Sequence, residues 1–249
     1  MLFRTFVVMK HDIEWLKRTR LLLGEKDIEQ LGHAHVLVAG LGGVGSSAAE
    51  FLCRAGVGKM TIADHDIVHA SNRNRQIPAL KSTEGMLKAD VMAARLKDIN
   101  PELKLEVIKD YLKDETIPGL LEKPFDYIVD AIDTLSPKFH LILNSVRRGL
   151  PIVSSMGSGG RLDPSFIKVA DISESYNCRL AYYLRKKLHK YDIYEGVTVV
   201  FSAEMPIKEA LEKVEEKNKK SVAGTISYMP VMFGGYCASV VIRGITGNK

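Results

Sequence analysis

The stretch VLVAGLGGVGSSAAEFLCRAGVGKMTIAD, residues 36–64, decides the fold of this 249-residue chain. VLVAG is a short β-branched and apolar run that ends in glycine, which is typical of a buried strand in a parallel sheet. The glycines at 40–45 predict a tight turn into a helix over residues 44–55, and KMTIA at 59–63 predicts a second strand. Strand, glycine turn, helix and strand in this order predict a mononucleotide site.

Four glycines and one acid are the first candidate nucleotide-binding residues. Gly40, Gly42, Gly43 and Gly45 let a phosphate approach the backbone, and the following helix presents free amides at the same point. Asp64 follows Gly40 by 24 residues and ends the second strand, where a carboxylate can accept hydrogen bonds from ribose hydroxyls. This pattern fits dehydrogenases, methyltransferases and adenylating enzymes alike, so other residues must identify the nucleotide.

Composition predicts one large α/β domain in a reducing compartment. Hydrophobic residues make up 46% of the chain, enough to bury roughly 70–75% of the unfolded surface without disulfides. Cys53, Cys178 and Cys237 are widely spaced and form no C-x-x-C pair, so we expect neither a disulfide framework nor a cysteine zinc site, and a cytoplasmic location. The net charge of +5 permits a polyanionic partner without requiring one. The apolar run at 6–9 is too short for a membrane span, and no membrane association is expected.

The loop after the second strand is predicted to extend the site. It holds Asp66 and the polar run SNRNRQ at 71–76, at the sheet edge where open α/β proteins bind ligands. We expect Ser82 or Thr83 to cap a helix that runs to about residue 99. Lys88 then lies in the first two turns of that helix, within reach of the phosphates.

Another predicted strand, at 125–131, delivers two more acids to this edge of the sheet. Asp133 directly follows the strand, as a ligand of a metal bound to phosphate would. Asp130 is interpreted instead as a packing or capping residue.

Alternating strands and helices predict a doubly wound, mostly parallel, Rossmann-like sheet with a C-terminal extension of mixed strands. We interpret the chain as a single domain with an N-terminal arm and helix (1–34), a nucleotide-binding half (35–160), and a half for acceptor binding and dimerisation (161–249). The last part is expected to contain strands at 167–172, 197–202 and 224–229, a basic helix at 178–190 and an apolar helix at 230–244. Its charge-rich residues 206–220 predict a mobile loop or a loosely held helix, and the mobile loop is expected near 203–222.

Five spaced motifs together make the chain resemble the ThiF and MoeB superfamily of ubiquitin-activating-like adenylating enzymes. They are GLGGVG at 40–45, D-x-D at 64–66, S-N-x-x-R-Q at 71–76, Lys88, and D-A-I-D at 130–133. Within the superfamily the chain is most similar to the tRNA threonylcarbamoyladenosine dehydratases. The similarity is carried by RTRLLLGEK at 18–26, NRQIPAL at 74–80, VDAIDTLSPK at 129–138 and SSMGSGGRLDPSFIKVADI at 154–172. It covers nearly the whole chain and is thinnest at 1–14 and 203–222.

The resemblance implies a site for ATP and Mg²⁺. It implies that Gly43 and its neighbours contact the nucleotide, that Asp64 holds the ribose, and that Asp133 reaches the magnesium ion and the phosphates. It also implies that Asn72, Arg75 and Lys88 surround the triphosphate. Their motif neighbours Asp66 and Gln76 are expected to bind the nucleotide as well.

The resemblance also assigns a role to the N-terminal arm. Composition alone favours an arm whose leucines at 21–23 pack on the body while Arg18 and Arg20 stay solvated. By resemblance, Arg18 matches an arginine that crosses into the partner's active site in ThiF-like homodimers, with Arg20 as its rival.

The implied reaction is adenylation of the threonyl carboxylate of threonylcarbamoyladenosine in tRNA, followed by a cyclising dehydration with release of pyrophosphate and AMP. Charge that accumulates on the phosphates would be stabilised by Arg18, Arg75, Lys88 and magnesium. A sulfur-relay protein is a possible further partner. Cys178 lies roughly where thioester-forming relatives carry a reactive cysteine, but its surroundings, YNCR at 176–179, favour a buried or incidental thiol.

Three alternatives remain open. Adenylation of the C-terminal glycine of a ubiquitin-like sulfur-carrier protein would use the same ATP residues, although the basic helix at 178–190 favours nucleic acid. A nucleotide-binding scaffold without turnover would not need Arg75, Lys88 and Asp133. An NAD dehydrogenase would share only the glycine turn.

Overall fold

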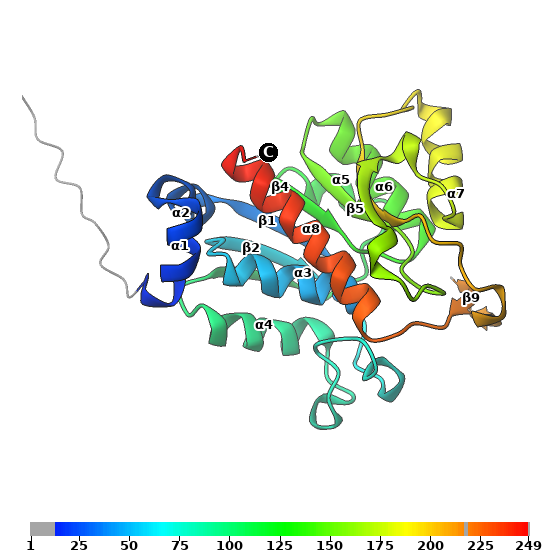
Figure 1. Ribbon diagram of the computed structural model, residues 1–249, viewed down its shortest axis with the longest axis horizontal. Coiled ribbons are helices and arrows are strands. Elements are labelled where there is room, and N and C mark those ends of the chain that lie inside the picture. The colour runs from blue at the N-terminus through cyan, green and yellow to red at the C-terminus, as the bar shows by residue number, and fades with distance from the viewer. Residues whose placement is uncertain (1–12, 217–218, 249) are drawn as a thin grey trace, which may run out of the picture.

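A seven-stranded sheet forms the centre of the computed structural model, which describes residues 13–216 and 219–248 (Figure 1). The strand order is β3-β2-β1-β4-β5-β7-β6. The strands are β1 (His35–Ala39), β2 (Lys59–Ala63), β3 (Lys104–Ile108), β4 (Tyr127–Asp130), β5 (Ile152–Ser155), β6 (Ile167–Asp171) and β7 (Thr198–Ser202). All neighbours in the sheet pair in parallel except β6, which is antiparallel to β7. The predicted doubly wound sheet with a mixed C-terminal extension is therefore confirmed.

Helices cover both faces of the sheet (Figure 1). They are α1 (Lys17–Leu23), α2 (Glu25–His33), α3 (Gly43–Arg54), α4 (Lys88–Ile99), α5 (Ile117–Leu120), α6 (Leu135–Arg147), α7 (Arg179–Leu188) and α8 (Tyr228–Thr246). Val36 and Val38 of β1 pack in one core cluster with α3, α4 and α8, whereas Leu37 packs in a second cluster with α5, α6 and α7. The alternation follows from the two-residue period of a strand, and it explains why β1 is apolar at every position but its first.

Short 3-10 turns connect several of these elements. They are η1 (Ile13–Leu16), η2 (Ala70–Asn72), η3 (Lys81–Thr83), η4 (Pro164–Phe166), η5 (Ile172–Glu174), η6 (His189–Tyr191) and η7 (Lys208–Ala210).

The helix that carries Lys88 starts later than the sequence predicted. Thr83 does not cap it; its hydroxyl accepts the Leu80 N–H at 2.9 Å and donates to the Pro78 carbonyl at 2.6 Å, which stabilises η3 instead. Gly85, with φ of 84°, then reverses the chain. As a result α4 begins at Lys88 itself, and this side chain projects from the first position of the helix.

Two predictions in the C-terminal third were wrong. Residues 203–222 contain an antiparallel pair of strands, β8 (Leu211–Glu216) and β9 (Lys219–Ala223), instead of a loop or a helix; residues 217 and 218 lie outside the described part. The strand expected at 224–229 is absent from the described structure: residues 224–227 lead directly into α8. Pro230 fits there because the first turn of a helix needs no N–H from it.

α8 is a core helix of this fold. Among the described residues it is the one helix long and apolar enough to cross a membrane by length and composition. Its buried side chains Phe233, Cys237 and Val241 recur every four residues and belong to the core shared with α3 and the sheet. A Cβ on Gly234 would lie 2.4 Å from the Ser47 hydroxyl oxygen of α3, so the two helices approach closely.

Replacing Gly45 by Ala should destabilise the fold by about 3 kcal/mol, because the added Cβ would lie 1.8 Å from the Gly40 carbonyl oxygen and force α3 away from β1. The free energy of unfolding from urea denaturation measures this loss. The matched control is Gly32→Ala in α2, where a Cβ meets no atom within 4 Å. It should stabilise the protein by about 0.5–1 kcal/mol. If the two variants were equally stable, the close contact between residue 45 and the Gly40 carbonyl would not require glycine.

Candidate active site

A cleft of about 620 Å³ opens where the carboxyl ends of β1, β2, β4 and β5 meet. Nine of the twelve site residues predicted from the sequence line it: Gly40, Gly42, Gly43, Asp64, Asp66, Arg75, Gln76, Lys88 and Asp133. They come from three connections separated in sequence, those that follow β1, β2 and β4, which the parallel sheet brings to one edge. The cleft is therefore the candidate active site.

The floor of the cleft is the turn between β1 and α3. Gly40 has φ of 88°, and a Cβ there would lie 2.7 Å from the Ala131 carbonyl oxygen. Gly42 is the N-cap of α3, and no side chain caps the helix. The first amides of α3 and the positive end of its dipole consequently point at the cleft, which suits an anion such as a phosphate.

Asp64 anchors this turn. Its Oδ2 accepts the Leu41 N–H at 2.6 Å and its Oδ1 accepts the Asp66 N–H at 2.8 Å. Burial raises the pKa of the Asp64 carboxyl, and the nearby Lys88 ammonium and the two amides only partly offset that effect. Each carboxylate oxygen keeps a lone pair for a further donor, so Asp64 can still accept a ribose hydroxyl.

Lys88 is held at the cleft wall by an acid. The residue is only 5% exposed, and its Nζ lies 2.9 Å from Asp66 Oδ2. Partial burial would raise the pKa of Asp66, but the hydrogen bond and the charge of Lys88 outweigh it, and the pKa is lowered. The Asp66 carboxylate is therefore stabilised in its ionised form, and it holds the Lys88 side chain beside the glycine turn.

Arg75 and Gln76 also line the cleft. Arg75 Nη1 donates to the Ser71 carbonyl at 2.9 Å and to Asn74 Oδ1 at 2.8 Å, which fixes its position. Burial lowers the pKa of Arg75, while the negative charge of Asp133 raises it. Gln76 Oε1 is buried and, among the described residues, has no hydrogen-bond partner. Such an acceptor at a cleft wall is suited to a donor on a bound ligand.

Three predicted site residues do not line the cleft. Asn72 is buried, and its Oδ1 accepts the His69 N–H at 3.1 Å, so it shapes the loop that carries Arg75. Gly45 lies inside α3, where it permits the close contact with Gly40. Arg18 is exposed on α1, and it is absent from the cleft of its own chain.

The arm does not pack as composition suggested. None of the α1 residues is buried, and Leu21 and Leu22 are 81% and 82% exposed. The expectation that the leucines at 21–23 pack on the body was therefore wrong for these two side chains; only Leu23 packs, partly buried, against the core.

A fully buried ion pair lies under the loop that ends in Asp133. Lys138 Nζ is 2.8 Å from Asp130 Oδ2, and both side chains are 0% exposed. Asp130 Oδ1 accepts the Ile132 N–H at 3.2 Å, and Lys138 donates to the Ile132 carbonyl at 3.0 Å. Ser154 donates to Asp130 Oδ2 at 2.6 Å. Asp130 thus has the packing role predicted for it, and together with Lys138 it fixes the backbone from which Asp133 projects.

Sequence reasoning did not single out Lys138, although a signal was present. Lys138, Leu141, Ile142 and Ser145 occupy one face of α6 at helical spacing, and all are buried. A lysine on an apolar helix face must find a buried acid, and Asp130 is that acid.

Arg161 is a second residue that the sequence did not reveal. It is 5% exposed, and its Nη1 donates to the carbonyls of Gly157 and Gly159 at 2.7 and 3.0 Å. Its Nη2 donates to the Asn177 carbonyl at 2.8 Å. Because Gly157 and Gly159 line the cleft and Asn177 immediately precedes Cys178 at the start of α7, Arg161 joins the cleft wall to that helix.

The three cysteines are unpaired and buried. The interpretation of Cys178 as a buried thiol agrees with its 8% exposure. Burial raises the pKa of Cys53 to about 11 and that of Cys237 to about 12, so both are neutral thiols at physiological pH.

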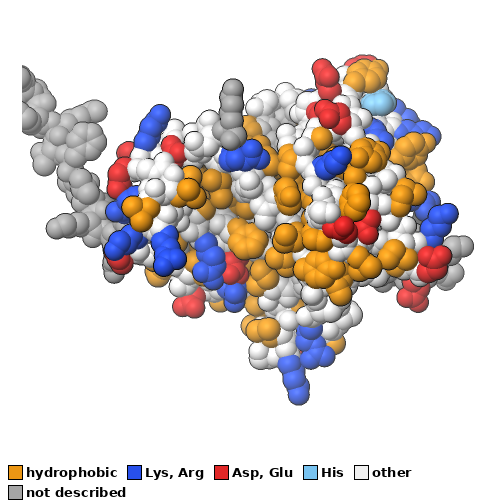
Figure 2. All heavy atoms as spheres, in the orientation of Figure 1, with side chains coloured by type: hydrophobic (Ala, Val, Ile, Leu, Met, Phe, Trp, Pro, Cys, Tyr) orange, Lys and Arg blue, Asp and Glu red, His pale blue; other side chains and the backbone are white. Residues whose placement is uncertain are grey.

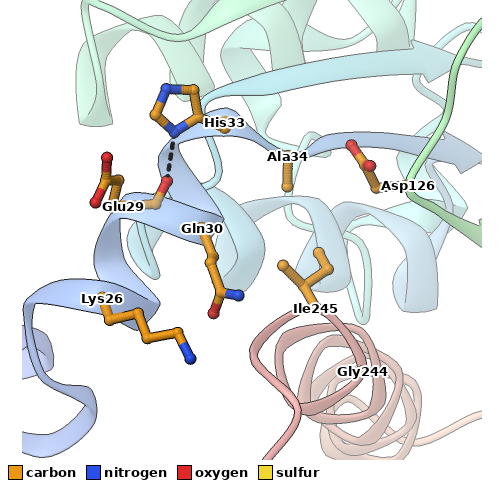
Figure 3. Close-up of a pocket in the computed structure, with 8 residues that line it drawn as sticks. All are labelled: Lys26, Glu29, Gln30, His33, Ala34, Asp126, Gly244 and Ile245. Atoms are coloured by element: carbon orange, nitrogen blue, oxygen red, sulfur yellow. Dashed lines mark hydrogen bonds between the residues drawn. The ribbon is translucent and has the colours of Figure 1, made fainter.

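A second cavity, of about 550 Å³, lies at the opposite edge of the sheet between α2 and the end of α8 (Figure 3). Its lining consists of Lys26, Glu29, Gln30, His33, Ala34, Asp126, Gly244 and Ile245. None of these is a predicted site residue. The His33 ring is oriented by a 2.8 Å hydrogen bond between Nδ1 and the Glu29 carbonyl oxygen.

Known proteins are similar to this chain in sequence and in architecture. The ThiF family profile matches residues 16–249. The tRNA threonylcarbamoyladenosine dehydratase of Bacillus subtilis is 43% identical over 190 residues, covering 76% of this chain and 75% of its own. The crystal structure of E. coli TcdA, a tRNA N6-threonylcarbamoyladenosine dehydratase, in complex with ATP superimposes with a TM-score of 0.87 at 33% identity, over 94% of this chain and 95% of that one. The E. coli sulfur carrier protein ThiS adenylyltransferase is 32% identical over 136 residues, 54% of each chain.

Replacing Lys138 by Met should lower the free energy of unfolding by about 3–5 kcal/mol, because it leaves the Asp130 carboxylate buried without its cation. Urea denaturation measures the change. Lys123→Met is the control: it breaks a partly exposed ion pair with Glu106 and should cost at most about 1 kcal/mol. If both variants lost the same stability, the buried pair would not support the loop as described.

Proposed function

The chain belongs to the ThiF family, and from this membership we propose that it is an ATP-dependent tRNA threonylcarbamoyladenosine dehydratase. It adenylates the threonyl carboxylate of threonylcarbamoyladenosine in tRNA and then closes a ring with net loss of water, releasing pyrophosphate and AMP. The observation that carries the proposal is the convergence of the glycine turn, Asp64, Arg75, Lys88 and Asp133 on one cleft. The superposition on E. coli TcdA in complex with ATP supports it over nearly the whole chain.

The reaction requires fixed positive charge around ATP. A carboxylate oxygen attacks the α-phosphorus, a bond between carboxylate and phosphate forms, and pyrophosphate leaves. Negative charge builds up on the phosphate oxygens during this step, and the α3 amides, Lys88 and Arg75, which all line the cleft, stabilise it. A nitrogen or oxygen of the threonylcarbamoyl group itself then attacks the activated carbonyl carbon, and AMP departs. This ring closure needs no enzyme nucleophile because it is intramolecular.

Magnesium is assigned to Asp133. An exposed carboxylate in the cleft fits Mg²⁺, which commonly takes one or two carboxylates together with substrate phosphates. Asp64, His65 and Asp66 also cluster, with ligand atoms within 4.8 Å of one another. They fit less well, because Asp64 accepts two backbone N–H groups and Asp66 pairs with Lys88. A bound magnesium ion supplies neutralisation of phosphate charge.

tRNA is the proposed acceptor, with the C-terminus of a sulfur-carrier protein as the second candidate. Residues 179–190 carry five Lys and Arg and no Asp or Glu, which favours a polyanion. The sulfur-carrier reaction is kept because the ThiS adenylyltransferase shares about half of the chain. A sulfur-relay partner and a cytoplasmic location belong to the same proposal.

We also propose a homodimer in which Arg18 enters the partner's cleft. Leu21 and Leu22 extend from α1 into solvent. On the face that carries α3 and α8, hydrophobic side chains gather in one area (Figure 2), and Phe51, Met232 and Tyr236 are exposed. A second copy of the chain would cover this surface and bring α1 toward the other cleft.

The purified protein, incubated with ATP, Mg²⁺ and tRNA bearing threonylcarbamoyladenosine, should yield a nucleoside lighter by one water, measured by mass spectrometry. A carrier-protein adenylate formed instead would favour the second candidate.

Arg75→Ala and Lys88→Ala should each lower kcat by about a hundred to a thousandfold, because each removes a fixed cation from the phosphates.

The control for this series is Arg73→Ala, in the same loop as Arg75 but exposed and outside the cleft. It should keep nearly full activity. Equal loss in the Arg73 and Arg75 variants would mean that the loop, and not the Arg75 charge, matters.

Mixing an Arg18→Ala subunit with a Lys88→Ala subunit should restore activity, because a heterodimer contains one cleft with both cations intact. Turnover is measured on heterodimers isolated with two affinity tags. The corresponding Arg20→Ala mixture is the control, since Arg20 pairs with Glu25 of its own chain at 3.3 Å. A confirmed heterodimer without activity would exclude donation of Arg18 in trans.

A further inference from the structure

The outer face of α7 carries a continuous stripe of aromatic and basic side chains. We call Arg179, Tyr182, Tyr183 and Lys186 of α7, together with Lys190 of the η6 turn that follows it, the α7 stripe; all five are exposed. The spacing of three or four residues places them along one side of the helix, opposite the buried Ala181, Leu184 and Leu188. The stripe is thus the solvent face of an amphipathic helix whose other face belongs to the core.

The two tyrosine rings are arranged by their neighbours. Tyr182 and Tyr183 are 54% and 40% exposed, and their ring centroids lie 5.4 Å apart at 67°. The Arg179 guanidinium lies over the Tyr183 ring, 5.6 Å from its centroid. Figure 2 shows hydrophobic side chains interleaved with Lys and Arg at the edge of the molecule where Figure 1 places α7.

The charged side chains of α7 and the turn after it are all positive. Residues 179–190 hold as many Lys and Arg as the net positive excess of the entire chain, +5, and no acid. The rest of the chain is balanced in formal charge. Arg185 is used internally, because its Nη1 donates to the carbonyls of Ile172 and Ser175. The positive charges left for a partner on the outer face are mainly those of the stripe.

The stripe begins beside the active-site cleft. Cys178 is the N-cap of α7, and a Cβ on Gly157 would lie 4.0 Å from the Cys178 sulfur. Gly157 lines the cleft, and Arg161 ties it to Asn177. The ten residues of α7 extend for about 15 Å from this point. That length matches about four nucleotides stacked at roughly 3.4 Å each.

We infer that the α7 stripe is the docking platform for the single-stranded loop of the RNA substrate next to the modified nucleotide. Unpaired bases stack on Tyr182 and Tyr183, and Arg179, Lys186 and Lys190 neutralise phosphates of the same strand. Exposed aromatic rings alternating with cations are the combination that binds single strands, because every base has a stacking face and every phosphate a charge. Binding of a protein partner would not require a surface that carries Lys and Arg but no Asp or Glu. The inference rests on the proposed function and adds where the RNA binds and how.

The test measures the affinity of the full-length protein for a synthetic anticodon stem-loop that carries threonylcarbamoyladenosine. Tyr182→Ala/Tyr183→Ala should weaken binding about tenfold or more, and Tyr182→Phe/Tyr183→Phe should bind like the native protein, because stacking needs only the ring. The same stem-loop with its loop annealed to a complementary oligonucleotide should bind the native protein more weakly. Unchanged affinity in the Ala variant, or equal binding of the annealed loop, would overturn the inference.

Salt dependence tests the cations separately. Lys186→Ala/Lys190→Ala should reduce the slope of log affinity against log salt concentration by about 1.4, the value for two contacts to a single strand. Lys97→Ala/Lys104→Ala is the charge-matched control, since both lysines are exposed at the end of α4 and the start of β3. It should leave the slope unchanged. An equal change in both pairs would show nonspecific attraction and overturn the inference.

Failure of the inference and failure of the proposed function are distinguishable. ATP affinity should be the same in all stripe variants, which verifies that they fold. If the native protein binds ATP but neither binds nor dehydrates the modified RNA, the proposed function fails. If it does both and the stripe variants match it, only the docking platform is wrong. Weakened binding of a sulfur-carrier protein with intact RNA binding would also overturn the inference, since the stripe would then be a protein surface.

Discussion

The architecture of the site depends on one steric constraint: α3 begins so close to the end of β1 that no side chain fits between them. A Cβ on Gly45 would lie 1.8 Å from the Gly40 carbonyl oxygen, and one on Gly40 would lie 2.7 Å from the Ala131 carbonyl oxygen. Only glycine satisfies both contacts, and Gly40 also needs its φ of 88°. This close contact directs the free amides of α3 into the cleft and brings the connection after β4 beside them.

Charged residues around the cleft are held in place by partners within the folded chain itself. Asp66 fixes Lys88, the Lys138–Asp130 pair supports the loop before Asp133, and Asp64 binds the backbone of the glycine turn. A buried ion pair contributes little net stability, because desolvation offsets the Coulomb attraction. Its value here is geometric, since it keeps the loops at the sheet edge in one conformation before a ligand arrives.

The cleft and the outer surface of α7 form one structural unit. Arg161 donates to carbonyls on the cleft wall and to the carbonyl of Asn177, which immediately precedes Cys178, the N-cap of α7. A long acceptor could therefore place its reactive group at the nucleotide while its flanking part lies along the helix. The second cavity, between α2 and the end of α8, is at the other edge of the sheet and takes no part in this arrangement.

The sequence by itself determined the parallel sheet and the glycine turn, and most of the site residues that it predicted do line the cleft. These depend on local patterns, namely apolar runs at the sheet strands, glycines at a turn and acids at strand ends, which can be recognised without tertiary contacts. Tertiary structure alone decided where α4 begins, that residues 211–223 pair as strands, that Leu21 and Leu22 stay exposed, and that Lys138 pairs with Asp130. Each of these depends on groups distant in sequence or on a surface left uncovered, and no local pattern encodes which partner, if any, a side chain will meet.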